Sequence, residues 1–99
     1  MTIKLVNRGT EGELLLEGRL DSATAQEADG VFVEVAQRFD RVILNLAGLQ
    51  YSSSAGLRLL LRLQQTMRRK SGELILTRVN KTVMEVLEMT GFAGILQFR

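Results

Sequence analysis

Three consecutive serines, Ser52, Ser53 and Ser54, are the residues of this 99-residue chain whose type and spacing could do chemistry. They follow an apolar, strand-like stretch and precede Ala55-Gly56 and a helical pattern, so their hydroxyls are expected at a helix N-terminus. A hydroxyl in that position can cap the helix, attack a substrate, help to cradle a phosphate or accept a phosphoryl group.

Composition argues against two of these four roles. The chain has no His and no Cys, which excludes Ser–His catalysis, thiol catalysis and nearly all transition-metal sites. Ser52 also stands where a nucleophile elbow needs its first Gly. The chain also lacks the Gly-x-x-x-x-Gly-Lys pattern that would indicate a phosphate-binding loop. We therefore expect neither an enzyme nor a bound metal or cofactor.

Capping and phosphorylation remain for the serines. Capping of the helix by Ser53 explains one serine but not three. A phosphoryl group adds about −1.5 to −2 charges and three acceptor oxygens, which a helix N-terminus tolerates. Phosphorylation should therefore leave the domain folded and repel a partner fitted to a neutral hydroxyl. A loss of roughly 3–4 kcal/mol of binding free energy lowers the affinity for the partner a few-hundred-fold.

The length and composition of the chain, with 45% hydrophobic and 24% charged residues, are typical of one compact domain over residues 1–99. No apolar stretch approaches the ~20 residues of a membrane span, and no secretory signal is visible. We therefore expect a cytoplasmic protein without membrane contact.

The net charge is only +2. A pI of 9.5 is weak evidence for nucleic acid, because almost nothing titrates between pH 5 and 9.

Hydrophobic periodicity predicts an α/β domain in the order β-β-α-β-α-β-α-(β), with helices packed on a mixed sheet of four to five strands. Asp21-Ser22 is expected to cap the first helix, and Asn80 the third, which Gly91 should end. The predicted strands span 3–7, 13–18, 41–46, 73–77 and 95–98, and a connection spans 8–12. The first helix runs from its cap to about residue 38, and the other two span 54–69 and 81–88.

The helix predicted over 54–69 has an apolar side and a polar ridge. The apolar side holds Leu57, Leu60, Leu61, Leu63 and Met67, with Leu59 at its margin. The polar ridge, defined by Arg58, Arg62, Gln65 and Arg69, begins beside the serines. It is either a solvated face or a partner-binding surface. A DNA-reading helix is disfavoured, because the ridge has no interleaved aromatics and no helix-turn-helix pattern precedes it.

Two segments resemble the STAS-domain anti-sigma factor antagonists. The segment over 18–25, GRLDSATA, resembles the family's Gly-x-Leu-Asp-x-x-Thr-Ala pattern. The segment over 42–57, VILNLAGLQYSSSAGL, resembles its strand, loop and helix start, which commonly ends Asp-Ser-Ser/Ala-Gly-Leu. The order of elements and a late Leu-x-Met-Thr-Gly-Phe segment over 87–92 also fit. The likeness covers nearly the whole chain.

The resemblance implies partner switching. In such systems the unphosphorylated antagonist binds an anti-sigma factor, usually a serine kinase of histidine-kinase-like ATPase fold, and frees its client. The kinase phosphorylates the antagonist with its own ATP, and a PP2C-type phosphatase reverses this. From the residues themselves we expect no nucleic-acid partner, and a free protein that is a monomer because no exposed heptad pattern or large apolar stripe is present.

By position, the resemblance places the phosphorylated residue at Ser54, with Ser53 as second choice. Asp21 matches the family's acidic residue near the site. Where the family often has Asp before the phosphoserine, this chain has Ser53, which removes a carboxylate from the kinase contact. The residues expected to touch the partner are Asp21, Ser22, Thr24, Ser52, Ser53, Ala55, Gly56, Leu57, Arg58 and Arg62.

Two other functions stay open from the sequence. One is a constitutive STAS scaffold subunit in a transporter or lipid-transport complex, which needs no turnover of a phosphoserine. The other is a STAS domain that binds a small molecule or nucleotide.

Overall fold

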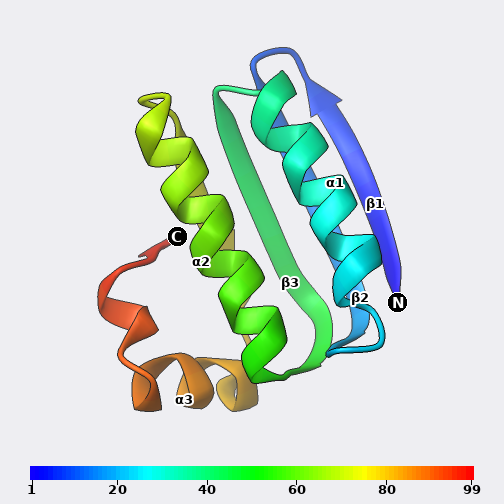
Figure 1. The fold of residues 1–99 in the computed structure, drawn as a ribbon, viewed down its shortest axis with the longest axis vertical. Coiled ribbons are helices and arrows are strands. Elements are labelled where there is room, and N and C mark those ends of the chain that lie inside the picture. Colours follow the sequence, from blue (N-terminus) through cyan, green and yellow to red (C-terminus); the bar gives the residue numbers. More distant parts are fainter.

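The computed structural model describes residues 1–99, which form one five-stranded mixed sheet and three α-helices (Figure 1). The strands lie across the sheet in chain order, β1-β2-β3-β4-β5. No helix is long and apolar enough to cross a membrane. The element bounds are β1 Thr2–Arg8, β2 Glu11–Leu20, α1 Ala25–Arg38, β3 Arg41–Ser52, α2 Ser54–Arg69, β4 Glu73–Thr77, α3 Lys81–Met89, the 3₁₀ turn η1 Phe92–Gly94, and β5 Gln97–Phe98.

The strand directions bring the serines to one edge of the sheet. β1 and β2 are antiparallel, and the pairs β2–β3, β3–β4 and β4–β5 are parallel. Only Gly9 and Thr10 join β1 to β2, fewer than the predicted connection over 8–12, because pairing continues until Arg8 lies opposite Glu11. β2 and β3 finish together, with Leu20 opposite Ser52. Partners and ligands of parallel sheets bind beyond such carboxyl ends.

The core lies between the sheet and the helices α1 and α2, which run side by side over one face of the sheet (Figure 1). The apolar side of α2 faces this core as predicted. Leu61 is only half-buried, however, whereas Leu59 is buried. The largest fully buried side chains are Phe39, Leu14, Leu16, Leu20, Leu44, Leu46, Leu49, Leu60, Met67, Leu74, Leu76 and Leu87.

The opposite face of the sheet carries a row of alternating charges across four strands. Arg8 lies opposite Glu11, Glu11 opposite Arg41, and Arg41 opposite Glu73. Arg41 is 2.8 Å from Glu73 and 3.5 Å from Glu11. The hydrogen bond that Arg41 donates to Glu73, together with the charges of both carboxylates, raises the pKa of Arg41. Because Arg is charged at every ordinary pH, the raised pKa of Arg41 adds no pH dependence of its own to folding.

Several elements differ from the sequence prediction, and β2, for example, spans Glu11–Leu20 rather than 13–18. β3 continues six residues past the predicted end at Leu46, because its pairing with β2 shifts register twice, at Leu15/Glu17 and at Gly18/Arg19. Such irregularities break the alternation that marks a strand in a sequence. α1 begins at Ala25, and its N-cap is Thr24 rather than Asp21-Ser22. The last strand is reduced to Gln97–Phe98 because 92–94 form the turn η1.

The first turn of α2 packs against the end of β2 at Gly56. A Cβ at this position would lie 2.5 Å from the Ser52 hydroxyl and 2.7 Å from Leu20 Cγ. It would also lie 2.9 Å from the Leu20 carbonyl oxygen. Since backbone cannot yield as a flexible side chain can, the absence of a side chain at Gly56 is what lets helix and strand approach this closely.

We predict that Gly56→Ala lowers the free energy of unfolding by about 1–3 kcal/mol through overpacking at this contact. Gly30→Ala is the matched control, because Gly30 lies in α1 with nothing within 4 Å of the added Cβ. The control should stabilise the protein by about 0.5–1 kcal/mol. Urea denaturation of both variants measures the difference, and equal stability of the two would contradict the packing argument.

Candidate functional site

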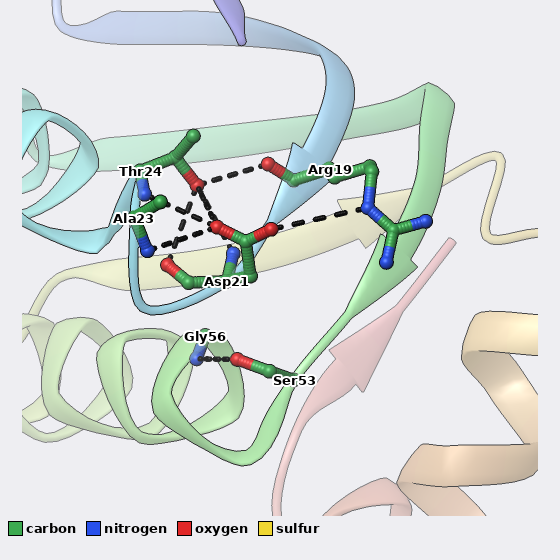
Figure 2. A network of polar contacts seen from close by, with 6 residues as sticks. All are labelled: Arg19, Asp21, Ala23, Thr24, Ser53 and Gly56. Carbon is green, nitrogen blue, oxygen red and sulfur yellow. Dashed lines mark hydrogen bonds and ion pairs between the residues drawn. The ribbon is translucent and has the colours of Figure 1, made fainter.

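The serine segment is a strand-to-helix junction with one residue between the elements, not the loop that the sequence predicts. β3 ends at Ser52, Ser53 links, and α2 begins at Ser54. Ser53 has extended backbone, and its hydroxyl accepts a hydrogen bond from the Gly56 N–H at 3.3 Å (Figure 2). The Ser53 N–H donates to the Leu20 carbonyl at 2.8 Å. Ser53 is therefore the N-cap of α2, as predicted, and ties α2 to the end of β2.

The two neighbouring serines are in opposite environments. Ser52 is only 3% exposed, and its hydroxyl donates to the Ser53 carbonyl at 3.2 Å. Ser54 is exposed, and its hydroxyl has no hydrogen-bond partner in the chain. The sequence cannot distinguish these three hydroxyls. In the structure the hydroxyl of Ser52 is buried, that of Ser53 caps α2 and that of Ser54 is free.

Asp21 builds the turn that faces this junction. One of its carboxylate oxygens accepts hydrogen bonds from the N–H groups of Ala23, at 3.0 Å, and Thr24, at 3.2 Å (Figure 2). The Thr24 hydroxyl donates to the Arg19 carbonyl at 2.9 Å and accepts from the Asp21 N–H at 3.0 Å. The predicted role of Asp21-Ser22 as helix cap is therefore wrong. Asp21 instead fixes the turn before the helix, and Ser22 is exposed outside this network.

Arg19 and Tyr51 join the site, although neither is among the residues expected to touch the partner. The Arg19 guanidinium lies 4.5 Å from the centroid of the Tyr51 ring, and its Nε is 3.8 Å from the second carboxylate oxygen of Asp21. The two residues meet because they are opposite each other in the β2–β3 pairing. That register depends on two irregularities and has no signal in the sequence.

The polar ridge of α2 is exposed at all four predicted positions. Arg62 forms an ion pair with Asp29 of α1 at 3.1 Å, so it bridges the two helices. Arg58 is closer to the serines and forms neither an ion pair nor a side-chain hydrogen bond. The structure therefore separates the two arginines by role, one engaged within the domain and one unpaired.

A shallow groove runs between α1 and α2 beside the ridge. It encloses about 150 Å³, and the Asp29–Arg62 pair lies at its rim. Its other lining residues are Phe32, Val33, Ala36, Gln37, Leu59, Leu63 and Thr66.

The junction presents hydroxyls and does not activate them. No carboxylate is hydrogen-bonded to Ser52, Ser53 or Ser54. Asp21, the acidic residue nearest in the network, accepts backbone hydrogen bonds within its own turn through one oxygen and faces Arg19 with the other. A base for the Ser54 hydroxyl would therefore have to come from another protein.

Comparison with known proteins identifies the family of the chain. A model of the STAS domain matches residues 4–99. BtrV of Bordetella bronchiseptica, named as an anti-sigma factor antagonist, is 37% identical over 99 residues, covering 94% of this chain and 83% of BtrV. An anti-sigma F factor antagonist of Paenibacillus polymyxa is 31% identical over 83 residues, covering 82% of this chain and 71% of that protein.

The fold is also that of a solved antagonist. The anti-sigma factor antagonist SpoIIAA in its unphosphorylated form has a TM-score of 0.78 at 17% identity, covering 99% of this chain and 87% of SpoIIAA. SpoIIAA in its phosphorylated form gives the same TM-score of 0.78. With the sequence relatives, this confirms the resemblance to the STAS-domain anti-sigma factor antagonists. The chain belongs to the STAS domain family, and anti-sigma factor antagonists are its relatives within that family.

Proposed function

We propose that this protein is the switch component of a partner-switching pathway. Its unphosphorylated form binds an anti-sigma factor that is also a serine kinase, and the kinase then releases its client. Phosphorylation of Ser54 ends the binding, and a PP2C-type phosphatase restores it. The observation that carries the proposal is that Ser54 is exposed and unbonded while its two neighbours are occupied.

Accessibility favours Ser54 over Ser53 and Ser52 as the phosphate acceptor. The acceptor oxygen must reach the γ-phosphate of ATP in the kinase, in line with the leaving ADP. Ser52 is buried, and a phosphate on Ser53 would disrupt the cap of α2 at a cost of about 1 kcal/mol. Ser54 meets neither obstacle. Its proton passes to a base of the kinase, and ADP leaves as the new P–O bond forms.

The charge at the start of α2 explains why phosphorylation would leave the domain intact. The first turn of α2 contains no acidic residue. The partial positive charge of the helix N-terminus therefore has no carboxylate to balance it, and a phosphate there is electrostatically favourable. The cost falls instead on a bound partner, which would have to desolvate the dianion. Roughly 3–4 kcal/mol of lost binding is enough for a few-hundred-fold switch.

The contact surface of the kinase is the first turn of α2, the Asp21 turn and the near end of the polar ridge. These parts are contiguous, because Ser53 is bonded to Leu20 and Gly56 packs on the same residue. The Asp21 turn and the start of α2 are held by hydrogen bonds to their backbone, so little ordering of these two parts is needed on binding. The protein acts in this scheme as a cytoplasmic, non-enzymatic monomer without nucleic acid, metal or cofactor.

We predict that incubation with the kinase and ATP adds one phosphoryl group, which intact mass and peptide mapping place on Ser54. Ser54→Ala should abolish the modification and retain kinase binding, and Ser54→Glu should weaken binding strongly. Ser53→Ala is the matched control and should still be phosphorylated. Phosphate on another serine, or unchanged kinase binding by Ser54→Glu, would falsify the proposal.

We also predict that the two serines differ in their contribution to stability. Ser53→Ala removes the cap of α2 and should lower the free energy of unfolding by about 1 kcal/mol. Ser54→Ala removes a hydroxyl without partners and should change it by less than about 0.5 kcal/mol. Denaturant titration of the two variants measures both values. A loss at Ser54 equal to that at Ser53 would show that the Ser54 hydroxyl is not free.

A further inference from the structure

Arg58 lies one helical turn after Ser54, on the same face of α2. Residues four apart in a helix have Cβ atoms about 5–6 Å from each other, which is the spacing of stabilising ion pairs. Side chains in a helix also lean toward its N-terminus, so the Arg58 side chain leans toward the turn that Ser54 begins. Both residues are exposed, and neither has a polar partner in the chain.

The other charged side chains around the first turn of α2 already have partners. The Asp21 carboxylate accepts from two backbone N–H groups and faces Arg19 at 3.8 Å. The Arg19 guanidinium also covers the Tyr51 ring. Arg62, one turn beyond Arg58, is paired with Asp29. Arg58 is the cation near Ser54 whose charge nothing in the domain balances.

We propose that Arg58 changes partner when Ser54 is phosphorylated. In the unphosphorylated protein Arg58 is available to an acidic group on the kinase, and in the phosphorylated protein it pairs with the phosphate on Ser54. This inference rests on the proposed function for the phosphorylation itself. Modification would then alter the binding surface twice, because it adds a dianion and withdraws a cation that the partner uses.

The intramolecular pair is tested on protein in which phosphoserine is incorporated at position 54 during translation. ³¹P NMR follows the titration of the phosphate, whose second pKa is ordinarily about 6. A neighbouring cation favours the dianion, so Arg58→Gln should move the midpoint upward, by about 0.3 pH unit for an i,i+4 pair of ordinary strength. The difference should shrink in about 1 M salt, where the Debye length is about 3 Å.

Arg69→Gln is the matched control, because Arg69 is exposed on the same ridge in the last turn of α2. It should leave the phosphate midpoint unchanged. An unchanged midpoint in Arg58→Gln, or an equal shift in both variants, would overturn the intramolecular pair. Because the phosphate is installed without the kinase, this outcome is separate from the proposed function. A kinase that fails to modify Ser54 would contradict only the latter.

The second half of the inference concerns the unphosphorylated protein and its kinase. Arg58→Gln should weaken kinase binding roughly five- to tenfold, the loss expected for one interfacial charge pair, and Arg69→Gln less than about twofold. Isothermal titration of both variants measures this. Equal affinities of Arg58→Gln and the unsubstituted protein would show that the kinase does not use Arg58. Unchanged thermal unfolding of Arg58→Gln verifies that the fold is retained.

Discussion

The close approach of α2 to the end of β2 at Gly56 determines the geometry of the site. With no side chain at Gly56, the helix start packs on Leu20, and the Ser53 N–H reaches the Leu20 carbonyl. This contact fixes the direction in which α2 leaves the sheet. It buries Ser52 beneath the helix, assigns Ser53 to the cap and leaves Ser54 in solvent. One backbone contact thus distributes three identical side chains among three environments.

The rest of the domain supplies a rigid frame for that contact. One face of the sheet packs against α1 and α2, and the other carries the row of charges in which Arg8, Glu11, Arg41 and Glu73 neutralise one another. The start of α2 has no such balance, because its first turn lacks an acidic residue. A phosphate at Ser54 would therefore enter a place where negative charge is favourable to the fold and unfavourable to a docked protein.

The sequence predicts most of the fold, because most elements have strong local signals. The structure confirms the bounds of α2 and β4, the capping residues Ser53 and Asn80, and the parallel crossovers. The length of β3 was predicted wrongly because it depends on the irregular pairing of β2 with β3. The same pairing brings Arg19 to Tyr51. The start of α1 was predicted wrongly because Asp21 and Thr24 bond within a turn that precedes the helix. Burial, which depends on tertiary packing, separates Ser54 from Ser52 and cannot be seen in a run of three serines.

The central claim is that a phosphate on Ser54 changes the partner-binding surface and leaves the fold of the domain unaltered. Amide hydrogen exchange, measured on the unphosphorylated protein and on protein carrying phosphoserine at position 54, tests this directly. The account predicts the same protection for the N–H groups of Ser53 and Gly56 and for the strands β2 and β3 in both forms. Faster exchange at Ser53 and Gly56 together with β3 would contradict it, because the phosphate would then be loosening the junction itself.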